Sequence, residues 1–596
     1  MESAKRSDRN SSKTPTRWGS FVFVCKVLGL RAKRWWDDRS STVRRWPIQQ
    51  SNHDAWTIRR ELRSQLWTSV EESERRFELG KVQNLRVACS QLHGIVLEPG
   101  TTFSFWRQIG RASRGRGFVV GRMLQQGCVI PAIGGGLCQL SNMLYGLALM
   151  SHCEILERHA HSVKMPNAPI HDATVAWNYI DLRFRVKQRT KIVAAMSADE
   201  LILEFQYDQP ISTALRTTEE TTSPGLAPAE SCETCNETNC FRHIGKSGVQ
   251  PIRETTAYIV DVYWPEFGQY VDRAKQSCDV LMLPVDGKRW KRPQYGWTTT
   301  GFARVHTAAP QTLWRAWHSR RLSAQGAERQ KHLQRSAMNL AAAFADRLTP
   351  EVTRLYVSQN LLPWLWRMGA MRGRRFEVLM NSPSMQMVQE TLDQCARLHP
   401  ESVTAMDFRA DRQLVTDELE ALHAAERLIT PNLWVAETMG ANAYIVPRIA
   451  LGKIKMKHQV SGRPRIYFPS GVLARRGAFE LREALQGLDV ELIVRGRSFE
   501  GNDFWKGIQL AGVGAIDEGV SAVVLPAFLL EQPRVLLDAL AAGIPVIATI
   551  NCGLPVMDGL TLVPVGDAAA LRDAIQTRIG TQEETAWAQE ETTIEA

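Results

Sequence analysis

Hydrophobic and polar residues divide the chain into regions of different pattern. Residues 1–55 are polar and basic and carry little periodic signal. From about 57 to 93, apolar residues recur at helical spacing, which predicts one or two helices. Residues 94–210 then mix glycine-rich turns with strand-like runs rich in β-branched and aromatic residues. We therefore expect an α+β domain over residues 56–210, preceded by a partly disordered segment.

The pattern changes after a linker over residues 211–253, which opens with ISTALRTTEETTSPGLAPAE and has few large apolar residues. From residue 254 onward, short apolar strands such as TAYIVDVYW, FEVLMN and IPVIAT alternate with helices. This alternation favours parallel sheets covered by helices on both faces. The length suffices for two doubly wound, Rossmann-like domains, which we place at 254–455 and 456–575, followed by a tail over 576–596. The fold class is thus multidomain α/β.

Composition and charge add two constraints. The 596 residues exceed what one hydrophobic core holds, and 44% of them are hydrophobic. Much of the formal net charge of +11 lies in RAKRWWDDRSSTVRRW (31–46), which could contact an anionic membrane surface. We favour a solvated arm for this stretch. No nucleic-acid-binding module accompanies the charge, so we expect no specific nucleic-acid partner.

The cellular location follows from what the sequence lacks. The apolar run WGSFVFVCKVLGL (18–30) is interrupted by Lys26 and is followed by no small-residue cleavage site. No run of about 18 apolar residues predicts a membrane span. Several of the eleven cysteines stand alone in apolar contexts, which suits a reducing compartment. We expect a cytoplasmic protein, with peripheral contact with the inner membrane as the alternative.

The first candidate site is the glycine-rich turn in IGGGLCQLSNMLY (133–145). Gly134, Gly135 and Gly136 permit positive φ and close backbone approach, and Cys138 follows in the first turn of a predicted helix. The N–H groups of such a turn favour a thiolate. His159 and His161 follow about twenty residues later. On a strand, residues at i and i+2 point to the same face.

A cysteine, a histidine and an orienting carboxylate form a nucleophile set for acyl transfer or peptide cleavage. The carboxylate could be Asp172 or Asp181, and Gln139 or backbone N–H groups of the turn could stabilise an oxyanion. Two other interpretations stay open. The residues could bind a ligand, such as a peptidoglycan precursor, without chemistry, or Cys138 could simply be a packed core residue.

The region from about 57 to 186 resembles the VanW family. The motifs that carry the resemblance are KVQNL (81–85), PGTTFSFW (99–106), RGFVVGR (116–122), IGGGLCQLSNMLY (133–145), ERHAHS (157–162) and DATVAWNYIDLRF (172–184). The family takes its name from vancomycin-resistance clusters. The resemblance implies a domain with cell-envelope associations, but no defined reaction.

The second candidate site is CETCNETNCFRH (232–243), which has the spacing C-x2-C-x4-C-x2-H. Three thiols and an imidazole can close a tetrahedron around Zn²⁺, and a metal could order this short segment. The ligands would be Cys232, Cys235, Cys240 and His243. A disulfide and an iron–sulfur cluster are the alternatives, of which the first fits poorly with a reducing compartment. We favour a structural zinc.

The third candidate site lies near the C-terminus, where residues 460–570 resemble the donor-side half of a GT-B glycosyltransferase. The resemblance is carried by RIYFPSGVLARRGAFELREAL (465–485), VELIVRG (490–496) and VSAVVLPAFLLEQPRVLLDALAAGIPVIATINCGLP (520–555). It implies that a donor diphosphate lies against the turn containing Gly471, Arg475, Arg476 and Gly477. Cationic side chains and helix N-termini do bind phosphate. The half before it, 254–455, resembles the acceptor-side domain more faintly.

The sequence departs from the GT-B pattern at two positions. Such enzymes carry two acidic residues eight apart beside the donor helix, and here Leu530 takes the first place and Asp538 the second. The neighbouring Glu531 could supply the missing carboxylate, so we take Glu531 and Asp538 as the acidic donor-binding candidates. Val472 replaces an arginine of the family. We expect Arg475 and Arg476 to be exposed and to contribute little to stability.

The leading functional prediction is a glycosyltransferase-like protein that transfers a sugar from a nucleotide-sugar donor to an envelope or polysaccharide acceptor. The GT-B resemblance implies that this step needs no metal. One alternative is a non-catalytic, envelope-associated scaffold with a degenerate transferase module. The other is a cysteine-dependent hydrolase or transpeptidase in the VanW-like domain.

Overall fold

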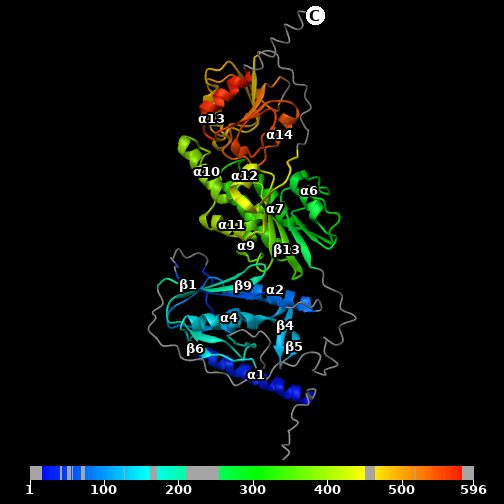
Figure 1. The fold of residues 1–596 in the computed structure, drawn as a ribbon, viewed down its shortest axis with the longest axis vertical. Helices are drawn as coiled ribbons and strands as arrows, with labels where there is room; N and C mark the ends of the chain where they lie inside the picture. Colours follow the sequence, from blue (N-terminus) through cyan, green and yellow to red (C-terminus); the bar gives the residue numbers. More distant parts are fainter. Residues whose placement is uncertain are drawn as a thin grey trace, which may run out of the picture. The chain divides into compact units, whose positions relative to one another are not determined.

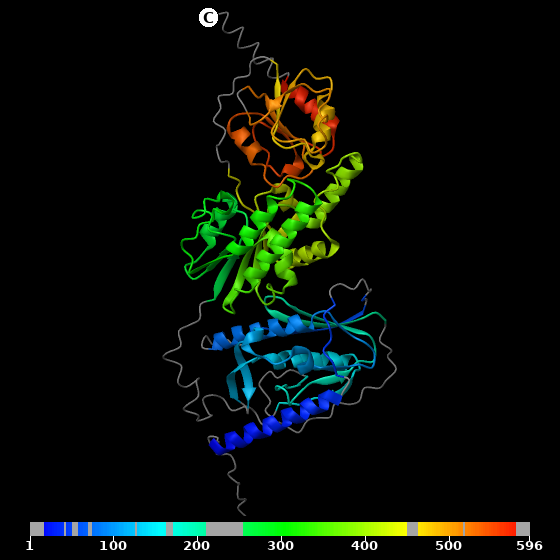
Figure 2. The same ribbon diagram turned by 180° about the vertical axis from the view of Figure 1, so that it is seen from behind.

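The computed structural model divides the chain into two compact units, residues 1–253 and 254–596. Figure 1 shows the fold, and Figure 2 shows it from behind. The described residues are 17–40, 43–49, 56, 58–68, 74–125, 128–161, 171–209, 254–449, 463–516 and 519–579.

Unit 1 is built on a four-stranded antiparallel sheet in the order β1-β9-β8-β2. Buried and partly buried positions alternate along β8 and β9, as the two-residue period of a half-buried strand requires. Helices α2 and α4 pack on this sheet. The bounds are β1 (Ile58–Gln65), α2 (Arg75–Leu92), β2 (Ile95–Leu97), α4 (Leu137–Met150), β8 (Thr190–Met196) and β9 (Glu200–Tyr207).

A second, three-stranded sheet in the order β3-β7-β6 and the hairpin β4-β5 complete unit 1. The rings of Phe103 and Phe184 stack 4.9 Å apart and belong to the same core as α2 and α4. The predicted α+β character is therefore confirmed. The bounds are β3 (Thr102–Ser104), α3 (Phe105–Ile109), η2 (Arg114–Arg116), β4 (Val120–Gln125), β5 (Cys128–Ile133), β6 (Glu154–Glu157) and β7 (Arg183–Arg185).

The N-terminal segment contains regular structure that its weak periodicity did not predict. Residues Arg17–Ser40 form helix α1, which lies beside β6 (Figure 1, Figure 2). Arg34 makes a bidentate ion pair with Glu157, with its shorter N–O distance at 2.5 Å. These ionic contacts, rather than an apolar stripe, explain why a periodicity search missed the helix. No helix in the described part of the chain is long and apolar enough to cross a membrane.

Unit 2 contains two parallel sheets with the doubly wound strand order. The first has the order β12-β11-β10-β13-β14-β15-β16, and every neighbouring pair is parallel. Its bounds are β10 (Thr255–Ile259), β11 (Val280–Leu283), β12 (Arg304–Thr307), β13 (Val352–Ser358), β14 (Arg375–Leu379), β15 (Arg427–Thr430) and β16 (Ala443–Ile445).

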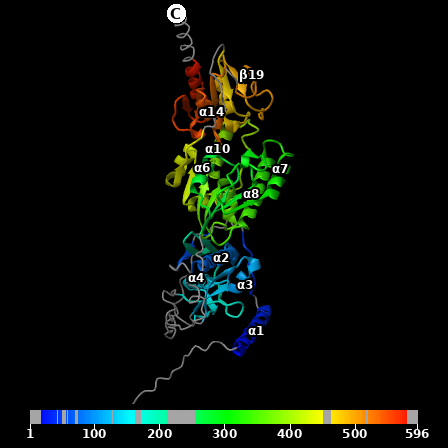
Figure 3. The ribbon, with the colours of Figure 1, turned by 90° about the vertical axis from the view of Figure 1, so that its right-hand side faces the viewer.

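Helices cover both faces of this first sheet. Ala257 and Ile259 of β10 belong to a core cluster that includes residues of α8 and α11, whereas Tyr258 packs with residues of α6 on the other face. Figure 3 shows the unit from the side. The bounds are α6 (Pro265–Ala274), α7 (Ala309–Ser319), α8 (Ala327–Ala345), α9 (Leu362–Arg367), α10 (Met385–Leu398), α11 (Arg412–Ala424) and α12 (Leu433–Met439).

The second sheet has the order β19-β18-β17-β20-β21-β22 and is also parallel throughout. The prediction of two doubly wound domains is therefore confirmed. The strand order reverses between β10 and β13 and again between β17 and β20, and ligands of such sheets bind at these points, beyond the carboxyl ends of the strands. The bounds are β17 (Arg465–Phe468), α13 (Ala478–Leu485), β18 (Glu491–Val494), β19 (Leu510–Val513), β20 (Ala522–Leu525), α14 (Arg534–Ala541), β21 (Val546–Thr549) and β22 (Leu560–Val563).

Candidate functional sites

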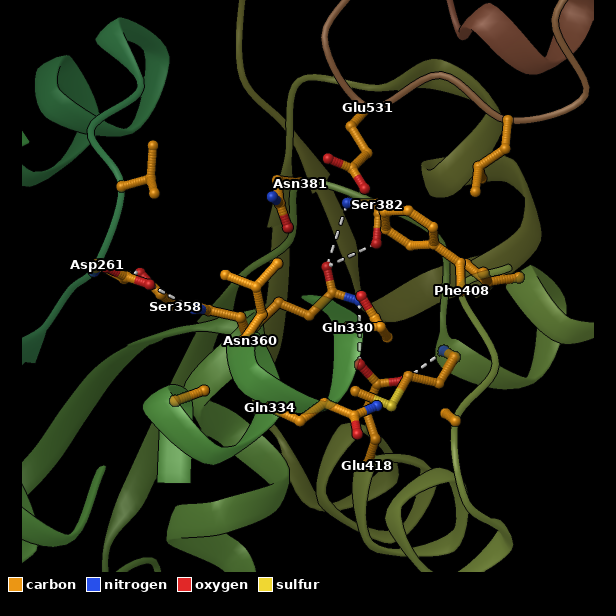
Figure 4. A pocket seen from close by; sticks show the side chains of 18 of the residues that line it. Asp261, Gln330, Gln334, Ser358, Asn360, Asn381, Ser382, Phe408, Glu418 and Glu531 are labelled. Carbon is orange, nitrogen blue, oxygen red and sulfur yellow. Dashed lines mark hydrogen bonds between the residues drawn. The ribbon is translucent and has the colours of Figure 1, made fainter. Parts of the chain in front are cut away.

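Unit 2 contains a cleft of about 500 Å³ that residues of both doubly wound domains line (Figure 4). The first domain contributes residues that follow its strands β10, β13 and β14, and the second contributes the turn after β17 and the segment after β20. The cleft therefore lies at the ligand-binding edge of both sheets. Its polar lining includes Asp261, Gln330, Gln334, Ser358, Asn360, Asn381, Ser382, Glu418, Arg475, Arg476 and Glu531.

Asp261 is held in place at the point where the first sheet reverses its strand order. The carboxylate is 3.1 Å from Arg315 Nη1 and accepts a hydrogen bond of 2.6 Å from Asn360 Nδ2. The charge of Asp261 raises the pKa of Arg315. The three side chains thus form a fixed polar group whose charges are paired.

Glu418 is a fully buried carboxyl on α11 that lines the same cleft. Gln359 Nε2 donates to it at 3.1 Å, and the backbone N–H of Met385 also donates. Burial outweighs these bonds and raises the pKa of Glu418 to about 7. Our sequence reasoning missed Glu418 and Asp261. Two sequence patterns could have identified them. Glu418 is an acid on the apolar stripe of a helix, and Asp261 is a polar residue directly after an apolar strand.

The predicted phosphate turn forms a 3-10 turn over Ala474–Arg476, closed by Gly477. Gly477 has φ 75°, and a Cβ atom there would lie 1.9 Å from the carbonyl oxygen of Pro526. Only glycine fits because both the backbone angle and the space exclude a side chain. Because Gly477 lies against Pro526, the two arginines before it lie directly beside the segment that follows β20.

Arg475 is buried and Arg476 is half-buried, so the expectation of exposed side chains was wrong. Arg475 is 5% exposed, and burial lowers its pKa to about 10. Its Nη2 donates to Gln325 at 3.0 Å, but Nη1 is buried and has no hydrogen-bond partner among the residues that the structure describes. Arg476 donates to the carbonyl oxygen of Leu529 at 2.7 Å, and burial lowers its pKa as well. Removing either side chain would therefore affect packing as well as charge.

A second cavity, of about 480 Å³, lies within the second domain, and Arg476 lines both this cavity and the cleft. Arg495, Arg534 and the first turn of α14 add positive charge to it. Leu530 and Asp538 both line this cavity. Glu531 lines the cleft instead.

The other two predicted positions of this site have structural roles. Val472 is a buried core residue whose N–H bonds to the carbonyl oxygen of Arg497 at 3.0 Å. The Cα of Gly471 would lie 2.9 Å from a Cβ atom at Gly496. The turn after β17 therefore packs closely against the turn after β18, and neither residue lines either cavity.

In unit 1, the structure brings Cys138, His161 and Asp172 together. Cys138 is the second residue of α4 and is hydrogen-bonded to the His161 side chain. Asp172 accepts from the backbone N–H of His161 at 2.7 Å and also contacts its ring Nδ1. These bonds place the imidazole between the sulfur and the carboxylate.

The other predicted members of this set lie elsewhere. Strand β6 ends at Glu157, so His159 and His161 do not share a strand face as expected. His159 is exposed and lies 3.3 Å from Glu157. Asp181 is buried and accepts hydrogen bonds from Ser104 and the Trp106 N–H, among others, so it serves the core. Both side-chain N–H bonds of Gln139 go to Ser64 and Gln65, which leaves none for an oxyanion.

The predicted zinc ligands Cys232, Cys235, Cys240 and His243 lie outside the described residues. Within the residues that the structure describes, no group of three or more histidine, cysteine or acidic side chains could hold a metal ion. The structural zinc stays a prediction.

Comparison with known proteins identifies the class of unit 1. Residues 80–207 match the family model described as VanW like protein. The Vancomycin B-type resistance protein VanW of Enterococcus faecalis is 35% identical over 115 residues, which are 18% of this chain and 42% of that protein. The uncharacterized protein YoaR of Bacillus subtilis is 27% identical over 136 residues, 22% of this chain and 45% of that protein. The chain spans less than half the length of either relative, and it contains a VanW-like domain.

Solved structures with some likeness to the rest of the chain are glycosyltransferases. Sucrose-phosphate synthase of Thermosynechococcus elongatus matches with a TM-score of 0.36 and 16% identity, over 55% of this chain and 90% of that one. Anabaena HepE in complex with UDP and glucose matches with a TM-score of 0.34 and 13% identity, over 56% and 92%. The lipopolysaccharide outer core galactosyltransferase WaaB matches with a TM-score of 0.33 and 10% identity, over 55% and 91%.

Proposed function

We propose that unit 2 is a glycosyltransferase that moves a sugar from a nucleotide-activated donor to a hydroxyl group of an acceptor. The observation that carries the proposal is a pair of adjacent arginines, the buried Arg475 and the half-buried Arg476, at the boundary between the cleft and the second cavity. Two neighbouring cations withdrawn from solvent, one with a nitrogen that has no hydrogen-bond partner among the described residues, are costly unless an anion approaches them. A diphosphate supplies the charge and the acceptor oxygens.

The second cavity suits the nucleotide part of such a donor. It lies beyond the carboxyl ends of β17 and β20, where the strand order of the second sheet reverses. Arg495 and the N–H groups at the start of α14 face it together with Arg476, which favours an anion there. Asp538 could accept hydrogen bonds from ribose or sugar hydroxyl groups in the same cavity.

The cleft suits sugars. Gln330, Gln334, Asn360 and Asn381 bring side-chain amides to its wall, and amides can donate and accept hydrogen bonds as sugar hydroxyls require (Figure 4). Phe408 adds an apolar ring surface. A few polar groups placed in an otherwise apolar hollow are typical of small-molecule sites.

The reaction follows from this arrangement. An acceptor hydroxyl oxygen bonds to the anomeric carbon of the donor sugar, the bond from that carbon to the diphosphate oxygen breaks, and the acceptor proton leaves. The leaving nucleoside diphosphate gains negative charge, which fixed cations such as Arg475 and Arg476 stabilise best at the moment it develops. Glu418 lines this cleft with a pKa that burial raises to about 7, close to the value that suits a general acid or base at neutral pH.

The acceptor class rests on the VanW-like domain. Its relative in Enterococcus faecalis carries a vancomycin-resistance name, which connects that protein with the cell envelope. We therefore take an envelope or polysaccharide hydroxyl as the acceptor. The competing interpretation is a scaffold without activity, because Leu530 stands where a carboxylate of the GT-B pattern is expected.

The test is nucleoside diphosphate release by the full chain, incubated in turn with a panel of UDP-, GDP-, ADP- and dTDP-sugars. One donor should be turned over, and Arg476→Met should lower kcat/KM at least tenfold, since a charge-assisted hydrogen bond contributes roughly 1.5–3 kcal/mol. Arg482→Met is the matched control. This arginine of α13 lies over Phe504 and lines neither cavity, so its loss should leave turnover unchanged. Absence of both turnover and binding for every donor would establish the scaffold interpretation.

A further inference from the structure

We infer that unit 1 contains a second, separate reaction centre, in which Cys138 is the nucleophile toward an acyl group on an anionic substrate. The inference rests on the hydrogen bonds around the sulfur, on the orientation of His161 and on the charges that line the pocket in front of them. It is independent of the sugar transfer proposed for unit 2.

The first observation is the number of hydrogen-bond donors around the sulfur. The His161 side chain and the backbone N–H of Val175 both donate to it, and the hydroxyl of Thr174 lies 3.6 Å away. Cys138 also stands in the first turn of α4, where N–H groups have no intrahelical acceptor and favour negative charge. This environment stabilises a thiolate, the reactive form of cysteine.

The second observation is that His161 is held in a fixed orientation. Asp172 accepts from both its backbone N–H and its ring Nδ1, and Arg158 Nε in turn donates to the carbonyl oxygen of Asp172 at 2.6 Å. The other ring nitrogen is left for the sulfur. Asp172 is thus a positioning residue, and His161 is the group that can exchange a proton with the reacting atoms.

The pKa shifts of Cys138 and His161 agree with this geometry. Burial opposes ionisation of Cys138, but the bonds from His161 and Val175 outweigh it and lower the pKa of the thiol. Bonds to Asp172 and Cys138 raise the pKa of His161 to about 10. By contrast, burial raises the pKa of Cys153 to about 12. Both shifts favour the charged pair of thiolate and imidazolium.

The third observation is a pocket of about 640 Å³ that Cys138 and His161 line. Four cationic side chains line it as well, and none of its described lining residues is acidic. The cations are Arg31, Lys81, Arg111 and Arg122. Lys81 is 6% exposed, and burial lowers its pKa to about 8, so an anionic ligand would favour its charged form. The substrate class is therefore an ester or amide that carries a carboxylate or phosphate.

The chemistry balances without a cofactor. The Cys138 thiolate bonds to the acyl carbon, the bond from that carbon to the leaving oxygen or nitrogen breaks, and the His161 imidazolium gives its proton to the leaving group. Water, or an amine, then attacks the thioester, His161 takes the proton of that nucleophile, and the Cys138 sulfur leaves. The N–H groups of Leu137 and Cys138 at the start of α4 are the donors available to the oxyanion.

The experiment uses the full chain and two activated esters as probes, mono-p-nitrophenyl succinate and p-nitrophenyl acetate. Nitrophenolate release is followed at pH 7, and the acylated cysteine is identified by peptide mass mapping. We expect a burst of nitrophenolate release and a succinyl group on Cys138. The ratio of the rate with the anionic ester to the rate with the acetate should be at least tenfold greater for the protein than for free cysteine. Lys81→Met should reduce this preference, whereas Cys153→Ala should change nothing.

Three variants show whether the site or merely an accessible thiol is responsible. Cys138→Ser should abolish the burst, and His161→Gln should slow it at least tenfold. Asp172→Asn keeps the hydrogen-bonding shape and should move the pH midpoint of acylation upward, a readout that a purely structural role would leave unchanged. Equal acylation of Cys138 and Cys153, or an unchanged rate in folded His161→Gln, would overturn the inference.

Discussion

The two units handle charge in opposite ways. In unit 1, the ionised groups of the site pair with one another, since Cys138 and Asp172 both hydrogen-bond His161. In unit 2, the buried Arg475 and the half-buried Arg476 are adjacent, and Arg475 Nη1 has no hydrogen-bond partner in the part of the chain that the structure describes. The reacting groups of unit 1 thus already have their partners, whereas the arginine pair of unit 2 is ready to bind an anion.

Because of this difference, we expect ligands and mutations to affect the two units differently. An anion that binds unit 2 should stabilise it, because the arginine pair gains an anionic partner. The site in unit 1 should depend on the internal bonds of its three residues more than on a ligand. The following changes test the two halves of the comparison, starting with the largest expected effect.

Gly477→Ala should destabilise unit 2 by about 4 kcal/mol, since it combines a strained backbone angle with a collision against the Pro526 carbonyl. Gly487→Ala is the matched control. Its φ of 73° is similar, but nothing lies within 4 Å of the added Cβ atom, so a cost of about 1 kcal/mol is expected. Urea unfolding of the full chain measures both. Equal costs would show that the close packing of the phosphate turn is unimportant.

Glu418→Gln should change how stability depends on pH in unit 2. Because the folded state keeps its proton up to a pKa of about 7, wild-type stability should fall as pH rises from about 4.5 to 7, by roughly 3 kcal/mol from this group. The variant should lose that slope. Urea unfolding at several pH values measures it, with Glu328→Gln, at an exposed ion pair, as the control. An unchanged slope would contradict the role assigned to burial.

His161→Gln should slow alkylation of Cys138 by iodoacetamide at pH 7 about tenfold. The thiol loses the bond that lowers its pKa, so the midpoint of its pH profile should move toward the ordinary value near 8.5. Peptide mapping gives the rate for each cysteine, and Cys153 provides an internal reference. If the Cys138 midpoint stayed where the wild type has it, the bond to His161 would have no influence on the thiol.

Arg34→Met should have the smallest effect, since it removes a partly buried ion pair with Glu157 worth about 1 kcal/mol. Hydrogen exchange of residues 17–40 should become faster while the exchange of α4 stays the same. Lys33→Met, at an exposed position of the same helix, is the control. Faster exchange in both variants alike would indicate a general loss of helix propensity.

The sequence was most informative where a motif is local. The glycine turn, Cys138 and the segment with His161 and Asp172 could be identified from the chain, because residues near in sequence form most of that site. Which histidine takes part could not be predicted, since it depends on where β6 ends. Burial of Arg475 was also unpredictable, because residues of the first domain, including Gln325 and Phe408, cover it.

Residues that come together only through the tertiary fold were missed altogether. Asp261 and Glu418 lie more than 150 residues apart and line the same cleft, but neither stands in a motif. In a parallel sheet, successive crossovers bring distant strand ends to one edge, so the pattern predicts where a site lies better than which residues compose it.

The most direct test of the account is hydrogen exchange of the full chain, measured by mass spectrometry with and without UDP, GDP, ADP and dTDP in turn. The account predicts that one nucleotide slows exchange in residues 469–477 and 526–536 of unit 2, and that replacing Arg475 and Arg476 by methionine removes this protection. Exchange around Cys138 in unit 1 should stay the same. If none of the four nucleotides protected these segments, the two arginines would not form a diphosphate site, and the central claim would be wrong.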